Sequence, residues 1–111
     1  MAGKNYIKGF LEDIVLHLIK KNGEMYGYEI TKNVQEITEG AIVVTEGALY
    51  PILHKLENKG LLTATFKNAN GRLRKYYALT KNGQTSSNIA EAELQQFMAG
   101  LSQLLNLKIA K

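Results

Sequence analysis

Residues 45–80 read TEGALYPILHKLENKGLLTATFKNANGRLRKYYALT, and their hydrophobic period changes after Gly60. Before that glycine, apolar residues recur at the spacing of a helix with one buried face. These residues are Leu49, Ile52, Leu53 and Leu56. After it, apolar and polar residues alternate in two runs, as in half-buried strands, and Asn70-Gly71 between the runs is a strong hairpin signal. The stretch therefore predicts a helix followed by a β-hairpin.

The helix in this stretch has a clear start signal and a proline close behind it. Thr45 is a good N-cap, because its hydroxyl can accept a hydrogen bond from a backbone N–H of the first turn. Pro51 has no N–H to donate, so a proline fits best near the first turn of a helix. We therefore expect this helix to begin near Ala48 and to end at Lys59.

Two further helices are expected before this one. The first covers about residues 11–22, with apolar residues at helical spacing and Asn22-Gly23 as its stop. Its apolar stripe is Leu11, Ile14, Val15 and Leu18. The second runs from about Tyr26 to Gly40, with apolar residues four and three positions apart.

The chain after the hairpin predicts one long helix that pairs with another. Thr80 is again a plausible N-cap, and the apolar residues beyond it follow the alternating spacing of a heptad seam. The seam is Ala90, Leu94, Phe97, Leu101 and Leu104. A helix over residues 81–108 would be about 42 Å long, whereas a compact domain of this size is only about 34 Å across. The seam would therefore be exposed, which predicts a homodimer.

Three short helices followed by a hairpin is the order of a winged helix-turn-helix. We expect a mainly α fold with a winged-helix domain at residues 1–80 and a dimerisation helix at residues 81–111. The net charge is +4, and residues 58–90 contain six basic residues and no acidic residue. A helix in the major groove and a basic hairpin on phosphates would use these charges on double-stranded DNA. The alternative is a dimeric winged-helix module that binds protein without binding DNA.

Composition excludes several other classes. The chain has 111 residues and no cysteine, which removes disulfides, thiolate zinc sites and cysteine nucleophiles. Its two histidines, His17 and His54, form no metal-ligand pair, and no phosphate-binding glycine loop or catalytic triad order is present. We therefore expect no enzyme activity, no cofactor and no metal. No apolar run has the length of a membrane span, and the first residues do not resemble a signal peptide, so we expect a cytoplasmic protein.

Three blocks of the chain resemble the PadR family of bacterial transcription regulators. They are YGYEI at residues 26–30, EGALYPILHKLENKGL at residues 46–61 and GRLRKYYALT at residues 71–80. The resemblance implies a homodimeric winged-helix repressor, and the single C-terminal helix is similar to the compact subfamily, which includes multidrug sensors. Ala48 departs from the usual threonine of the second block. For the drug-binding members, the resemblance implies that the drug lies between paired tryptophans of the last helix. This chain has no tryptophan, and Phe97 is the only aromatic residue of its last helix.

Candidate DNA contacts lie at the start of the second helix, on the third helix and on the wing. They are Tyr26, Thr45, Glu46, Tyr50, Lys55, Asn70, Arg72 and Arg74. Tyr50 and Lys55 lie off the apolar stripe, where they serve either DNA contact or surface solubility. Tyr26 can donate its hydroxyl to a phosphate near the positive end of a helix dipole. Lys4 and Lys8 are further candidates for phosphate contacts.

The last helix carries the predicted dimer and effector residues. Dimerisation is assigned to Leu94, Phe97, Leu101 and Leu104. A space between the two long helices would be lined by Phe97, Met98 and Leu101, with Leu11 and Val15 nearby, and would suit a small hydrophobic or planar aromatic ligand. The alternative is that these side chains fill the space themselves. The expected function is a repressor that such an effector releases from its operator.

Overall fold

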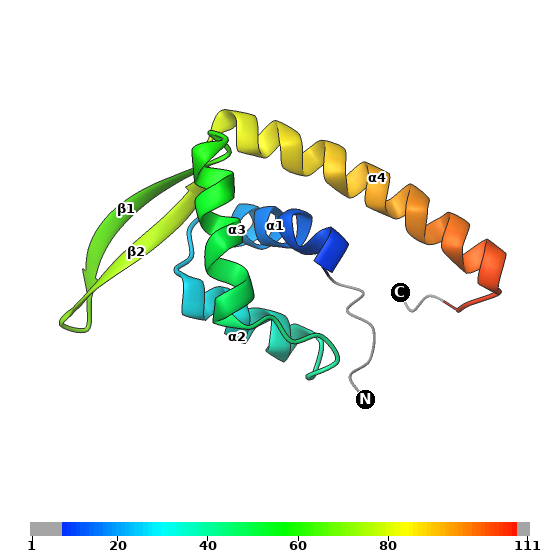
Figure 1. The fold of residues 1–111 in the computed structure, drawn as a ribbon, viewed down its shortest axis with the longest axis horizontal. Coiled ribbons are helices and arrows are strands. Elements are labelled where there is room, and N and C mark those ends of the chain that lie inside the picture. Colours follow the sequence, from blue (N-terminus) through cyan, green and yellow to red (C-terminus); the bar gives the residue numbers. More distant parts are fainter. Residues whose placement is uncertain (1–7, 109–111) are drawn as a thin grey trace.

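The structure is a computed structural model that describes residues 8–108, so residues 1–7 and 109–111, including the candidate contact Lys4, lie outside it. Its elements are η1 (Lys8–Phe10), α1 (Leu11–Asn22), α2 (Gly27–Ile37), α3 (Glu46–Asn58), β1 (Leu62–Ala69), β2 (Arg72–Leu79) and α4 (Lys81–Leu105). Figure 1 shows the hairpin projecting from one end of the helices and α4 extending toward the opposite end. The expected winged helix-turn-helix with a long last helix is confirmed.

The hydrophobic core lies where α1, α2, α3 and the base of the hairpin meet. Its fully buried side chains come mainly from the predicted stripes, namely Val15, Ile19, Ile30, Leu49, Leu53 and Leu56. The hairpin contributes Leu62 and Tyr77, which lie on the face of the strands turned toward the helices. Met25, between α1 and α2, exchanges two backbone hydrogen bonds with Tyr77, at 3.0 and 2.8 Å. This pairing ties the start of α2 to the wing.

Helix α3 begins at Glu46, so the expected start near Ala48 is wrong. Thr45 is the N-cap, and its Oγ1 accepts a hydrogen bond from the Ala48 N–H at 3.2 Å. The Thr45 cap therefore starts the helix at Glu46, two residues before the start that was inferred from Pro51. Pro51 consequently lies in the second turn. A proline there leaves the Gly47 carbonyl without its usual N–H partner. Gly47 and Pro51 are both exposed, so water can satisfy that carbonyl.

The hairpin turns at Asn70-Gly71, as its sequence predicts. Both residues have positive φ, 53° and 77°, which is the conformation of the two-residue turn that this dipeptide favours. The strands pair in the register Leu62↔Leu79 to Ala69↔Arg72. Beyond the core the same apolar face continues into solvent, where Phe66 is 65% and Leu73 is 70% exposed. The outer half of the wing is therefore not covered by the helices.

Helix α4 is capped by Thr80, whose Oγ1 accepts from the Gly83 N–H at 3.0 Å. Its first half packs on α1, and its second half leaves the body of a molecule that measures 50 × 34 × 25 Å. Among residues 8–108 no helix combines the length and the apolar character needed to cross a membrane. Helix α4 ends at Leu105, three residues before the predicted end, because Asn106 adopts a left-handed conformation.

Candidate nucleic-acid interface

An open groove of about 280 Å³ lies between the start of α2, the exposed face of α3 and strand β2. Three of the predicted DNA contacts, Tyr26, Tyr50 and Arg74, line this groove. They are far apart in sequence and meet because the Met25–Tyr77 pairing brings β2 beside the start of α2. The groove is also lined by residues that the sequence analysis did not select, namely Gly27, His54, Leu73, Lys75 and Tyr77. His54 follows Tyr50 by four residues, the spacing that places both on one face of a helix.

A column of rings and cations begins in this groove at Tyr26 and Arg74 and continues beyond it to Tyr76 and Lys67. The Arg74 guanidinium carbon lies 4.3 Å from the centre of the Tyr26 ring. The Tyr26 ring meets the Tyr76 ring edge to face, with 5.3 Å between ring centres. The Lys67 ammonium lies 5.3 Å from the centre of the Tyr76 ring. The two positive charges of this column, on Arg74 and Lys67, are thus held against aromatic faces, to which cations are attracted.

The start of α2 is shaped to admit the Tyr50 side chain. Gly27 is buried, and a Cβ atom added to it would lie 2.8 Å from the Tyr50 hydroxyl oxygen. A larger residue at position 27 would therefore require the Tyr50 ring to move. Burial, followed by the nearby Glu46 carboxylate, raises the pKa of the Tyr50 hydroxyl. The hydroxyl is consequently protonated at neutral pH and can donate a hydrogen bond to an anion.

Lys55 does not line the groove. Its Nζ lies 2.6 Å from Glu12 Oε2 of α1, and Lys59 Nζ lies 3.4 Å from Glu12 Oε1. The hydrogen bond from Lys55 is the main cause of the lowered pKa of Glu12. Five residues of helix separate Lys55 from Tyr50, which turns the two side chains about 140° apart. The predicted contacts on α3 thus lie at opposite edges of its exposed face.

The remaining predicted DNA residues lie at the start of α3 and at the tip of the wing. The Thr45 hydroxyl caps α3, and Glu46 is in the first turn of that helix. Asn70 and Arg72 are exposed at the hairpin tip, away from the helices. The structure therefore brings Tyr26, Tyr50 and Arg74 together in the groove. The other candidates lie outside the groove, either on α3 and its N-cap or at the tip of the wing.

The predicted dimer and effector residues divide into exposed and buried sets. Leu104 is 84% and Phe97 53% exposed, Met98 is also exposed, and Leu94 and Leu101 are half-buried. Phe97 packs near Phe10, with ring centres 5.8 Å apart. Leu11 and Val15 are buried in the core, and Val15 has no exposed surface at all. Val15 faces the interior of its own chain, so the expectation that it contacts an effector is wrong.

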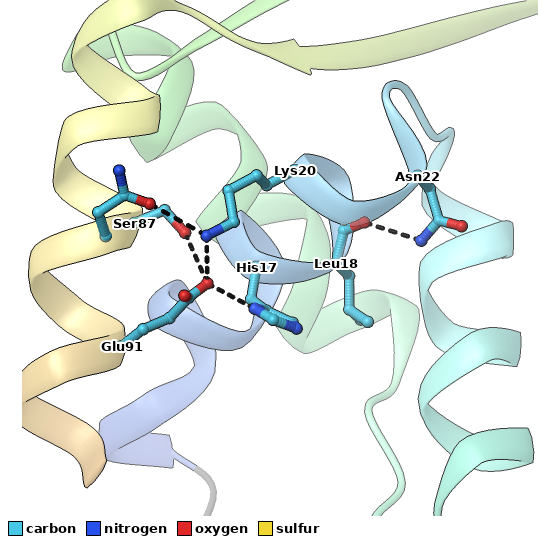
Figure 2. Close-up of polar contacts among 7 residues, drawn as sticks. His17, Leu18, Lys20, Asn22, Ser87 and Glu91 are labelled. Carbon is cyan, nitrogen blue, oxygen red and sulfur yellow. Dashed lines mark hydrogen bonds and ion pairs between the residues drawn. The ribbon is translucent and has the colours of Figure 1, made fainter.

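A polar cluster joins α1 to α4, and the sequence analysis did not anticipate it (Figure 2). Glu91 Oε2 of α4 accepts from His17 Nδ1 and from Lys20 Nζ, both at 2.6 Å. Ser87 Oγ, 3.4 Å away, donates to the same oxygen, and Lys20 also donates to Asn88 Oδ1 at 3.1 Å. The bonds from Lys20 and His17 lower the pKa of Glu91 to about 2. The cluster ties the middle of α4 to α1.

Comparison with known proteins places the chain among transcription regulators. A sequence model described as "Transcriptional regulator PadR-like family" matches residues 15–88. A transcriptional regulator of Mycobacterium tuberculosis is 36% identical over 72 residues, which are 65% of this chain and 64% of that protein.

Two solved structures share nearly the whole fold. A transcriptional regulator from Clostridium thermocellum has a TM-score of 0.80 at 26% identity, over 93% of this chain and 97% of that one. A PadR family transcription regulator from Clostridium difficile has a TM-score of 0.76 at 30% identity, over 87% of this chain and 99% of that one. Both similarities extend well beyond the matched segment into the last helix.

Proposed function

This chain belongs to the PadR-like family of transcriptional regulators, which bind DNA, and from that premise we propose that it is a homodimeric repressor that binds its operator with α3 and the wing. The family regulates transcription and is not a family of enzymes. Family membership also favours DNA over the alternative of a protein-binding module. As a regulator of transcription it acts in the cytoplasm, where bacterial DNA lies.

The groove between α2, α3 and β2 is the observation that most supports this choice of DNA-binding surface. Its wall presents Arg74 on an aromatic face, and the hydroxyl of Tyr50 remains a donor at neutral pH. Tyr26 and His54 line the same groove. We extend the surface to the exposed Thr45 and Glu46 at the start of α3 and to Lys55 at the opposite edge of its exposed face. Asn70 and Arg72 extend it along the wing, where a basic hairpin reaches phosphates or the adjacent minor groove.

The unpartnered half of α4 supports dimerisation. Leu104, on the part of α4 that leaves the body of the molecule, and Phe97, whose ring lies near that of Phe10, both expose apolar surface. A second copy of the chain would cover this surface, together with the half-buried Leu94 and Leu101. A symmetric dimer would place its two copies of α3 on a pseudo-palindromic operator, whose half-sites lie about 34 Å or a multiple of that apart.

Between the two copies of α4 we place a site for a small hydrophobic or planar aromatic effector. Phe97, Met98 and Leu101 would line it, with the 7% exposed Leu11 nearby, whereas Val15, which has no exposed surface, does not contribute. Such a ligand releases DNA only if it binds the DNA-free conformation better, and a tenfold loss of DNA affinity requires about 1.4 kcal/mol of coupling.

The test of the proposed function is a titration of the chain's own upstream DNA, followed by fluorescence anisotropy at several salt concentrations. Specific binding with a steep inverse dependence on salt supports it, since contacted phosphates release counterions. Binding of scrambled DNA with equal affinity, or binding that does not depend on salt, would overturn it.

Planar hydrophobic dyes test the effector site. Phe97→Ala should weaken the binding of such dyes, and bound dye should lower the affinity for the operator.

A further inference from the structure

We propose that Tyr26 is a positioning residue, whose ring holds the Arg74 guanidinium in the orientation that contacts DNA. This inference rests on the proposed DNA-binding function and adds a role that the Tyr26 hydroxyl does not supply. The carrying observation is the 4.3 Å distance between the Arg74 guanidinium carbon and the centre of the Tyr26 ring. It joins the wing to the helix-turn-helix at the groove itself.

The Tyr26 ring is a suitable platform because the backbone on both sides of it is anchored. Its own N–H donates to Glu29 Oε1 at 3.1 Å, which fixes the start of α2. The preceding residue, Met25, pairs with Tyr77 through two backbone hydrogen bonds. The following residue, Gly27, is buried beneath Tyr50. The backbone that carries the ring is therefore held in place relative to β2.

Arg74 differs from the lysines that surround the same surface. Lys55, Lys67 and Lys75 each form an ion pair with a carboxylate, on Glu12, Glu24 and Glu57 respectively. Within residues 8–108, Arg74 forms no ion pair, and its guanidinium lies on the Tyr26 ring. A ring orients a cation without neutralising its charge. Arg74 thus keeps its full charge and its N–H donors for a phosphate or a guanine edge.

Tyr26 also controls the position of the strand that carries Arg74. Tyr76, two residues along β2 and on the same face of the strand, packs edge to face on Tyr26 at 5.3 Å. The outer wing has no apolar cover from the helices, as the exposed Phe66 and Leu73 show. Contacts such as this one therefore determine how the wing is oriented toward α3, and an arginine that is already oriented loses less freedom on binding.

The experiment compares Tyr26→Leu, Tyr26→Phe and Arg74→Ala in operator titrations, with thermal unfolding of each variant as a check on folding. Tyr28→Leu is the matched control, since Tyr28 is an exposed tyrosine two residues away, in the first turn of α2. We expect Tyr26→Leu to lower the affinity for the operator roughly three- to tenfold. Tyr26→Phe, which keeps the ring, should restore affinity to within about twofold of wild type, and Tyr28→Leu should have no effect.

A double-mutant cycle separates this role from a general structural one. In the Arg74→Ala background, Tyr26→Leu should cause no further loss, because the group it positions is absent. Equal losses for Tyr26→Phe and Tyr26→Leu would overturn the proposal in favour of a hydroxyl contact. Additive losses in the double variant would also overturn it. If wild type does not bind operator at all, the proposed function fails first, so the two failures are distinguishable.

Discussion

Glu12 on α1 holds Lys55 on α3, with 2.6 Å between the carboxylate oxygen Oε2 and the ammonium nitrogen. Lys59 shares the same carboxylate at 3.4 Å. A phosphate of DNA would have to compete with Glu12 for both ammonium groups. Helix α1 therefore supplies a carboxylate that would compete with DNA for the proposed phosphate contact of Lys55 on α3.

Glu12→Gln should strengthen operator binding. The substitution removes a negative charge from the DNA side and frees Lys55, so we expect an affinity gain of up to about fivefold. The dependence of log K on log salt should steepen by about 0.9 for each phosphate newly contacted. Asp13→Asn is the control, because it removes the neighbouring charge without releasing Lys55. An affinity that is unchanged in Glu12→Gln would show that Lys55 does not contact DNA.

Arg72→Ala should weaken operator binding and flatten its salt dependence. Arg72 is exposed beside the Asn70-Gly71 tip and is free to reach a phosphate. We expect the salt slope to fall by about 0.9 per lost phosphate contact, and the loss of affinity to be similar for operator and scrambled DNA. Lys108→Ala, at the far end of the described chain, should leave the slope unchanged. A loss confined to operator DNA would instead assign Arg72 to base recognition.

Leu104→Asp should disrupt the dimer without unfolding the monomer. Leu104 is 84% exposed in the single chain, so an aspartate there meets water in the monomer and apolar surface in the dimer. We expect the dimer dissociation constant to rise about a hundredfold or more, which corresponds to about 2.7 kcal/mol. Sedimentation velocity measures this, with Gln103→Asp as the control on the same helix. An unchanged dimer in Leu104→Asp would place the interface elsewhere.

The polar cluster between α1 and α4 predicts a pH-dependent contribution to stability. The folded protein lowers the pKa of Glu91 from its ordinary value of 4.5 to about 2, because Lys20 and His17 bind the ionised carboxylate. The contribution is therefore fully present above about pH 4.5 and is lost as the pH falls toward about 2. Because Glu91 is partly exposed to solvent, we expect it to be at most about 1 kcal/mol.

Urea unfolding of wild type and Glu91→Gln at several pH values measures this contribution. The variant should be less stable at pH 7, and the two proteins should converge at the acid end of the series. Glu93→Gln is the control on the same helix, and its difference from wild type should not follow the same curve. A constant difference between wild type and Glu91→Gln across the series would contradict the assignment of the cluster.

Much of the fold was predictable because its signals act over a few residues. Asn70-Gly71 specifies a tight turn through the left-handed conformation that both residues tolerate. The Thr80 hydroxyl caps a helix within three residues of itself. The start of α3 was misplaced because two local signals disagreed, and the Thr45 cap prevailed over the preference of Pro51 for the first turn.

The contacts within the interface were less predictable, because they join residues far apart in sequence. Tyr26 and Arg74 were each expected at the DNA side, yet no spacing rule indicates that one stacks on the other. Lys55 was correctly expected off the apolar stripe and exposed, but its partner Glu12 lies 43 residues away. Val15 shows the reverse case, since helical period alone does not say whether an apolar side chain faces its own core or a partner.

The sequence by itself determined the order of the helices and the hairpin, the turn at Asn70-Gly71, the Thr45 and Thr80 caps and the basic stretch that ends in the wing. Propensity, capping and hydrophobic period are properties of neighbouring residues, so they can be read along the chain. Only the tertiary structure decided which charges remain available on the surface. Packing places Glu12 against Lys55 and the Tyr26 ring against Arg74, and it thereby neutralises one predicted contact while it orients the other with its charge intact.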